Sequence, residues 1–265
     1  MAERLVALDL DGTTVNHAGE LSPVVRDAVR AVADAGVHVV IATGRSTVAA
    51  MPVIDALGLS HGFAVCSNGA VTLELDPSEN GGYRFLDVVT FDPAPALNLL
   101  RERIPDAAVA VEELGVGFKL SKPFPDGELV GQLRVVEWEE LVSAPATRVT
   151  LRSPEATAEE FMRLVGEAGL HEVSYAVGWT AWLDINPEGV SKGSALEQVR
   201  RHLSVEPAHT LAVGDQRNDL EMLHWAARGV AMGNAPDEVK AVADEVTGHV
   251  DEDGLLPVLL SLLDA

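Results

Sequence analysis

Two carboxylates stand at the end of an apolar run near the start of the chain. In the run "RLVALDLDG", Leu10 separates Asp9 from Asp11, and Gly12 follows Asp11 directly. Two acids at i and i+2 of a continuing strand would point to opposite faces, but Gly12 allows the chain to turn and bring Asp11 back over the strand end. Such a pair could supply a carboxylate nucleophile and a neighbouring acid, with a hard cation to balance both charges.

Two structural interpretations of this stretch are less favoured. A helix N-cap would explain an acid, but no helical pattern begins here. A calcium loop of the EF-hand type would place Glu20 at its twelfth position, counted from Asp9. The sixth position is then Thr14 instead of the required glycine, and the preceding segment is a strand and not a helix.

A second group of acids follows another apolar run, in "LAVGDQRNDLEML". Asp219 could simply cap a helix, and Asn218 could simply be a loop residue. Asp215 is harder to explain by structure alone. Together with Asp9, it would provide oxygen ligands for an octahedral Mg²⁺ ion.

Two further segments have features of an anion-binding site. In "ATGRS", Thr43 and Gly44 end a strand, and Gly44 lets backbone amides approach a ligand closely. In "GVSKGSAL", Lys192 lies in the first turn of a helix, where it opposes the helix dipole unless an anion lies against it. The alternatives are an ordinary strand-to-helix turn for "ATGRS" and a solvated surface lysine for Lys192.

Apart from Lys192, these residues follow short apolar runs that are rich in Val and Ala and do not alternate. That pattern is typical of strands buried on both faces of a parallel sheet. Helical patterns lie between the runs, so we expect a doubly wound α/β core with its ligands at the carboxyl ends of the strands. The expected helices are "SPVVRDAVRAVADAG", with Ser22 as N-cap and Gly36 as terminator, "STVAAMPVIDALG", "SKGSALEQVRRHL", "NDLEMLHWAARG" and "APDEVKAVADEV".

The alternation of strand and helix breaks in the middle of the chain. Turn residues in "SENGG" and "NPEG" mark the two ends of this segment. We therefore expect a core of residues 1–82 and 187–265, with an α+β domain of residues 83–186 inserted as a lid. Its expected elements are the strands "YRFLDVVTF" and "TRVTLRS", the helices "APALNLLRERI" and "TAEEFMRLVGEAG", and a strand pair in "EVSYAVGWTAWLDI" joined at Gly178.

Composition limits the class of partner. The 265 residues include 41 acidic and 19 basic side chains, a net charge of −22, and 47% are hydrophobic. This balance argues against nucleic acid and anionic membranes as partners. Cys66 is the only cysteine, so no intrachain disulfide can form, and we expect a cytoplasmic protein because neither a signal peptide nor a membrane span is evident. The sequence makes no prediction of oligomeric state.

Taken in order, the motifs resemble the haloacid dehalogenase superfamily of phosphotransferases. "DLDGT" matches its nucleophile motif, "ATG" its Thr/Ser motif, "SKGSAL" the third and "GDQRND" the fourth. Only ten residues separate Asp11 from Ser22, too few for a lid after the first strand. The position of the insertion, with "SNGA" and "MGNA", is similar to the Cof-type subfamily IIB with its α+β cap.

The resemblance implies a role for each matching residue. Asp9 would attack phosphorus and form an aspartyl-phosphate, and Asp11 would act as acid and then base. Mg²⁺ would be bound by Asp9 and Asp215, with the Asp11 carbonyl and Asp219 in or near its shell. The phosphoryl oxygens would be held by Thr43, Gly44, Lys192 and Asn218, and two further asparagines, Asn68 and Asn234, would line the cleft.

The implied function is a Mg²⁺-dependent phosphatase acting on small phosphorylated metabolites, plausibly sugar phosphates. A phosphomutase would use the same aspartyl-phosphate but return it to a bound sugar. A non-enzymatic sensor of phosphorylated ligands would be expected to lack Asp9 or Asp11, and both are present. A dinucleotide-binding dehydrogenase is disfavoured because no GxGxxG follows the first strand.

Overall fold

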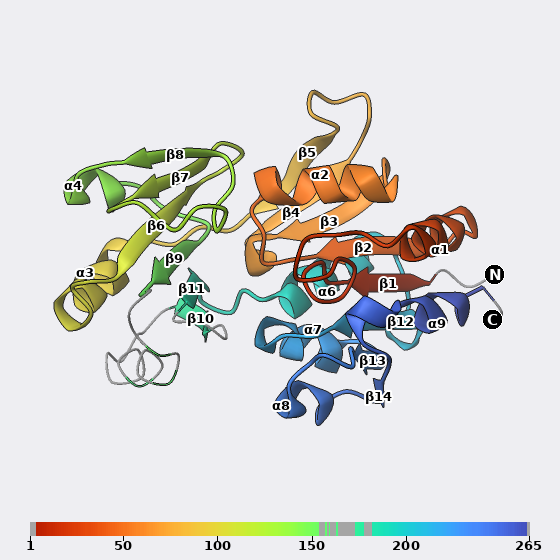
Figure 1. Cartoon of the computed structure of the whole chain (residues 1–265). Helices are drawn as coiled ribbons and strands as arrows, with labels where there is room; N and C mark the ends of the chain where they lie inside the picture. The colour runs from red at the N-terminus through yellow and green to blue at the C-terminus, as the bar shows by residue number, and fades with distance from the viewer. Residues whose placement is uncertain are drawn as a thin grey trace. The chain divides into compact units, whose positions relative to one another are not determined.

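The structure, a computed structural model, describes residues 4–153, 157, 159, 163, 173–177 and 182–263. The chain divides into two compact units (Figure 1). Unit 1 consists of Met1–Gly44, Ala50–Asp87 and Ser191–Ala265, and unit 2 consists of Arg45–Ala49 and Val88–Val190.

Unit 1 is built on an eight-stranded sheet with the order β14-β13-β12-β1-β2-β3-β4-β5. β1 (Leu5–Leu8) lies between β12 (Thr210–Gly214) and β2 (His38–Ala42) and is parallel to both. These strands are buried along almost their whole length, as expected for strands covered on both faces. The remaining strands are β3 (Gly62–Cys66), β4 (Val71–Leu75), which is antiparallel to β3, β5 (Tyr83–Val88), β13 (Arg228–Ala231) and β14 (Glu245–Val246).

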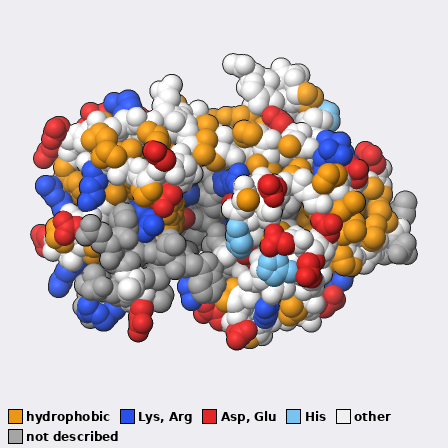
Figure 2. Space-filling view, viewed as in Figure 1, with side chains coloured by type: hydrophobic (Ala, Val, Ile, Leu, Met, Phe, Trp, Pro, Cys, Tyr) orange, Lys and Arg blue, Asp and Glu red, His pale blue; other side chains and the backbone are white. Residues whose placement is uncertain are grey.

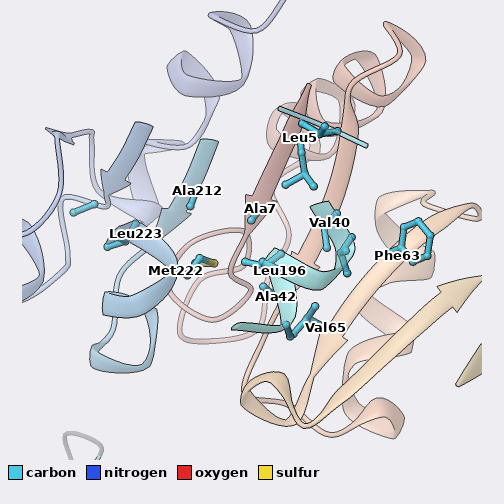
Figure 3. Close-up of a cluster of buried hydrophobic side chains, with 14 of the residues drawn as sticks. Leu5, Ala7, Val40, Ala42, Phe63, Val65, Leu196, Ala212, Met222 and Leu223 are labelled. Atoms are coloured by element: carbon cyan, nitrogen blue, oxygen red, sulfur yellow. The ribbon is translucent and has the colours of Figure 1, made fainter. Parts of the chain in front are cut away.

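Helices cover both faces of this sheet. On one face, α6 (Lys192–His202) and α7 (Leu220–Trp225) pack on β1, β2 and β12, and Figure 3 shows Leu196, Met222 and Leu223 among the strand side chains. α1 (Pro23–Asp34) and α9 (Leu256–Leu260) pack together away from that cluster. The other helices are α2 (Thr47–Leu57) and α8 (Asp237–Lys240). The predicted doubly wound core is confirmed.

Unit 2 is an α+β structure with a six-stranded sheet of order β10-β11-β9-β6-β7-β8. Its strands are antiparallel except for the pair β7 and β8. One face packs on α3 (Ala94–Arg103) and α4 (Trp138–Leu141) through an apolar cluster that includes Leu97, Val109 and Leu151. The strands are β6 (Ala108–Glu113), β7 (Gly117–Leu120), β8 (Gln132–Val135), β9 (Val149–Arg152), β10 (Val173–Val177) and β11 (Trp182–Pro187).

Two elements differ from the sequence-based expectation. β5, expected at the start of the insertion, is the edge strand of the unit 1 sheet next to β4. The helix expected over 235–246 ends at Lys240, because the next residues pair with β13 instead: the Asp244 amide donates to the Gly229 carbonyl and Glu245 forms an ion pair with Arg228.

Parts of the expected insertion lie outside the described residues, namely Gly178 and most of "TAEEFMRLVGEAG". Among the described residues, no helix is long and apolar enough to cross a membrane. On the face seen in Figure 2, acidic and basic side chains are interspersed. Three of the carboxylates predicted from the sequence to do chemistry, those of Asp9, Asp215 and Asp219, are buried instead.

Candidate functional site

The chain turns sharply where β1 ends. The Asp9 amide continues the pairing of β1 with β12 by donating to the Val213 carbonyl (3.0 Å). The Leu10 carbonyl then accepts from the amides of Thr14 (2.9 Å) and Val15 (2.8 Å), and the Thr14 hydroxyl donates to the Asp9 carbonyl (2.6 Å). This compact loop fixes the Asp9 carboxyl group at the carboxyl end of the central strand.

Gly12 is required at the tip of this turn for two reasons. Its φ of +83° lies in the left-handed region, and a Cβ atom there would overlap the Asp215 carboxyl group. The turn therefore brings the β1 loop against the end of β12. Asp11 lies in the same turn, and in contrast to Asp9 it is exposed.

A buried ammonium group joins two of the predicted carboxylates. Lys192 Nζ donates to Asp9 Oδ1 and to Asp219 Oδ1, both at 2.6 Å, and all three side chains are buried. Lys192 is the first residue of α6, whose N-terminus is fixed by reciprocal hydrogen bonds between Ser191 and Ser194. The surface lysine considered from the sequence is thus excluded, since Lys192 is 1% exposed.

Asp219 organises the loop that follows β12. Its Oδ2 atom accepts from the backbone amides of Asp215 and Gln216, both at 2.9 Å, while its Oδ1 atom accepts from Lys192. Gly214 leaves room for it, because a Cβ atom there would lie 2.5 Å from Asp219 Cγ. Both Asp219 oxygens are therefore already hydrogen bonded within the protein.

Asp215 has three polar neighbours. The Thr13 hydroxyl donates to its Oδ1 atom at 3.2 Å, and the side-chain amides of Gln216 (3.0 Å) and Asn234 (3.2 Å) donate to its Oδ2 atom. Asn234 also donates to the Gly12 carbonyl at 2.8 Å, so it links the β1 loop to Asp215. Asn234 was predicted to line the cleft, whereas no role was predicted for Thr13 or Gln216. The available signal was that Gln216 directly follows Asp215 and that Thr13 lies two residues after Asp11.

The electrostatics of this cluster are dominated by burial and by repulsion between carboxylates. Burial, and then the charge of Asp219, raise the pKa of Asp9 well above its usual range, and the same two causes raise the pKa of Asp215 to about 7. Burial alone would lower the pKa of Lys192, but the charges of Asp219 and Asp9 outweigh it and raise that pKa. The site therefore holds more negative charge than one lysine neutralises.

The donor set fits a hard divalent cation. Asp9, Asp215 and Asp219 offer carboxylate oxygens that lie within 4.8 Å of one another, and all three residues are buried. Oxygen-only ligands suit cations such as Mg²⁺, and a cation would also relieve the repulsion that raises the two pKa values. Because Asp219 is occupied by Lys192 and two amides, Asp9 and Asp215 are better placed to bind such a cation directly.

A second group of predicted residues gathers at the ends of β2 and β3. Thr43 is fully buried, and its carbonyl accepts from the Asn68 amide at 3.1 Å. Asn218 Nδ2 donates to Asn68 Oδ1 at 2.9 Å. A Cβ atom on Gly44 would lie 2.9 Å from Asn68 Oδ1 and 3.3 Å from Asn218 Nδ2, so these amides sit directly over its backbone.

The predicted residues are thus brought together in two adjoining groups. Asp9, Lys192, Asp215 and Asp219 form the charged cluster, and the second group contains Thr43, Gly44 and Asn218. Asp219 and Asn218 are consecutive, so the loop after β12 contributes to both groups. Asp11 adjoins the cluster through the β1 loop but is exposed at its edge.

Comparison with known proteins identifies the family. A family model for haloacid dehalogenase-like hydrolases matches residues 6–85 and 134–259, which include every residue of both groups. The chain belongs to this family. The one segment between the matched ranges, residues 86–133, lies in unit 2 except for its first two residues.

Individual relatives align with this chain over nearly its full length. Phosphatase YwpJ of Bacillus subtilis is 28% identical, over 98% of this chain and 100% of that protein. In the same organism, 5-amino-6-(5-phospho-D-ribitylamino)uracil phosphatase YcsE is 27% identical, over 95% of this chain and 92% of that one. A solved structure, the haloalkanoate-superfamily phosphatase BT1666 of Bacteroides thetaiotaomicron, is 28% identical, covers 98% and 95% of the two chains, and superimposes with a TM-score of 0.79. The chain is a haloacid dehalogenase-like phosphatase.

Proposed function

We propose that this phosphatase hydrolyses small phosphomonoesters such as sugar phosphates, with the help of Mg²⁺ and through a phosphoryl group carried on Asp9. The observation that carries the proposal is the buried contact of Lys192 with Asp9 at 2.6 Å beside two further carboxylates. A nucleophile in this position needs its charge maintained and the charge of the incoming phosphate neutralised.

In the first step, a carboxylate oxygen of Asp9 forms a bond to phosphorus while the bond to the leaving alcohol breaks. Attack requires the ionised form of Asp9, and burial favours the protonated form. Lys192 opposes that effect. Its ammonium has three N–H groups, of which two bind Asp9 and Asp219, so the third is available to a phosphoryl oxygen.

Asp11 is suited to proton transfer because it lies two residues beyond the nucleophile and is exposed. It would protonate the leaving alcohol and then take a proton from the water that attacks the phosphoryl group. That second step releases inorganic phosphate and restores the Asp9 carboxylate.

Asp9 and Asp215 would hold Mg²⁺, with Asp219 fixing the loop that positions Asp215. When bound, the ion supplies charge neutralisation at the phosphoryl oxygens. Thr43, the Gly44 amide and Asn218 would bind the same oxygens from the side of β2 and β3, where their backbones and side chains converge.

The substrate class is supported by a relative and by the division of the chain. YcsE is named for a small phosphorylated pyrimidine, and its match covers 95% of this chain. We propose that unit 2, which contains residues 88–186 of the expected insertion, forms the cap domain and selects which small phosphorylated molecule is accepted. We also propose that the protein acts in the cytoplasm.

The test is phosphate release from a panel of sugar phosphates and other small phosphomonoesters, with Mg²⁺ and with EDTA. The proposal predicts release that requires Mg²⁺ and disappears in Asp9→Asn. Release that is equally fast in EDTA, or that persists in Asp9→Asn, would contradict it.

A further inference from the structure

An unusual backbone turn follows β3. Ser67, Asn68 and Gly69 have φ values of +50°, +55° and +105°, three consecutive residues in the left-handed region. Only the third is glycine, and the conformation is unfavourable for the other two. Such a turn persists only when surrounding contacts hold it. Residues with an unfavourable backbone conformation are common at functional sites.

The contacts of this turn reach three other segments of the site. The Asn68 amide donates to the Thr43 carbonyl at 3.1 Å, and Asn68 Oδ1 accepts from Asn218 Nδ2 at 2.9 Å. Gly69 packs so closely on the Ser191 carbonyl, directly before Lys192, that a Cβ atom would overlap it. The turn therefore touches the ends of β2, the loop after β12 and the start of α6.

Asn68 lies at the centre of this arrangement and is 6% exposed. Its side-chain amide and that of Asn218 lie over the Gly44 backbone, in the space that a side chain at position 44 would fill. The groups proposed to bind phosphoryl oxygens therefore all lie at or beside a contact of this turn: Thr43, Gly44, Asn218 and Lys192.

The hydrogen bond that Asn218 donates to Asn68 also fixes the orientation of the Asn218 side chain. Asn218 Nδ2 carries two N–H groups, and one is directed to Asn68 Oδ1. Within the described residues the second N–H has no acceptor, although Asn218 is half-buried. Holding one N–H in a fixed direction also fixes the other, because the amide is planar.

We propose that Asn68 is a positioning residue: it directs the second N–H of Asn218 to the phosphoryl group and fixes the Thr43–Gly44 backbone beside it. This inference rests on the proposed function and adds to it a residue that contacts no reacting atom. The ligand class is a tetrahedral oxyanion, either the phosphoryl group of the substrate or free inorganic phosphate.

Asn68→Gly is the decisive variant, because glycine adopts the left-handed conformation without strain and only the side-chain amide is lost. We expect KM for a phosphomonoester, and the Kd of inorganic phosphate, to rise about 10- to 100-fold. This is the loss of affinity expected when one hydrogen bond to a charged group is removed. Thermal unfolding should stay close to the wild type. Ser204→Gly is the matched control, since Ser204 has a φ of +56° and is exposed at the end of α6.

A double-mutant cycle with Asn218→Ala separates positioning from a general structural role. If Asn68 acts through Asn218, then Asn68→Gly has little further effect on KM once Asn218 is already alanine. Gly44→Ala tests the same pair from the opposite side, because the added Cβ would displace both amides, and its effect should also be reduced in the Asn218→Ala background.

The outcomes are distinct. Wild-type phosphate release combined with an unchanged KM in Asn68→Gly, or with fully additive losses in the cycle, would overturn the role of Asn68 and leave the proposed function standing. A wild type that neither releases nor binds phosphate would overturn the proposed function, and the role of Asn68 with it.

Discussion

Each unit contains a buried ionic group, and the two groups are built differently. In unit 2, the Arg148 guanidinium lies 3.3 Å from Glu112, and both side chains are buried. Asp184 is 3.9 Å from Arg148, is partly exposed, and accepts from the Thr150 hydroxyl at 2.7 Å. Among the residues that the structure describes, the fully buried part is one cation and one anion.

In unit 1, one buried ammonium faces three buried carboxylates. Two of these carboxylates, those of Asp9 and Asp215, have raised pKa values because burial and mutual repulsion are not fully balanced by Lys192. A balanced buried pair is a structural element, whereas an unbalanced cluster is suited to bind a cation or an anionic substrate with its cation.

The largest effect is expected from Asp9→Asn. The amide keeps the shape and the acceptor for Lys192 but cannot attack phosphorus, so phosphate release should fall by roughly 10⁴-fold or more. The loss of one repelling charge should leave the melting temperature of the metal-free protein unchanged or higher. Asp27→Asn, at an exposed ion pair on α1, is the control and should match the wild type in both assays.

Glu112→Ala should affect stability and not the chemical step. It leaves the Arg148 guanidinium buried without its nearest carboxylate, and breaking such a pair costs about 3–5 kcal/mol of the free energy of unfolding. Urea denaturation measures the loss. A variant as stable as the wild type would show that the pair in unit 2 is not a structural element of this kind.

The pH dependence of the metal-free protein should reveal the imbalance in unit 1. The pKa of Asp215 is about 7 in the folded protein, compared with the ordinary value of 3.8 expected in the unfolded chain. Between these two pH values, the folded form therefore holds a proton that the unfolded form has lost. The free energy of unfolding should therefore fall as pH rises from about 4 to 7, by on the order of 1 kcal/mol per pH unit from this group.

Denaturation near pH 5.5 and near pH 7, in EDTA and in Mg²⁺, measures this slope. Asp215→Asn should reduce it, and Mg²⁺ should flatten it, because a bound cation stabilises the ionised carboxylates. An equal slope in Asp215→Asn would assign the effect to other groups.

The smallest effect is expected at an exposed ion pair. Arg201 lies 2.7 Å from Glu197 on α6, but its side chain is 73% exposed. Arg201→Ala should change the free energy of unfolding by less than about 0.5 kcal/mol, because solvent screens the pair and Arg200 also binds Glu197. A loss comparable to that of Glu112→Ala would mean that burial is not what separates these pairs.

The sequence was sufficient to predict the core because every motif except "SKGSAL" directly follows a short apolar strand. Since parallel strands place their carboxyl ends together, Asp9, Thr43 and Asp215 could be assigned to one edge of the sheet, and Lys192 to a helix beginning there. The same local reasoning failed for β5 and for the end of α8, where pairing with β4 and β13 outweighs local pattern.

The finer contacts depend on tertiary geometry that no spacing encodes. Asp219 could be named as a cap or a ligand, but its bonds to two amides and Lys192 required the folded loop. In the sequence Asn68 was visible only as part of "SNGA". Its left-handed φ and its hydrogen bond with Asn218, which is 150 positions away in the chain, are features of the folded protein.

The most direct test of the central claim is to trap the phosphoryl group on the protein. A radiolabelled phosphomonoester identified in the panel would be mixed with the enzyme and Mg²⁺, stopped rapidly with acid, and the protein digested and mapped. The account predicts label on the peptide that contains Asp9, released by hydroxylamine and absent from Asp9→Asn. Phosphate release at the full rate with no label on the protein at any time would contradict it.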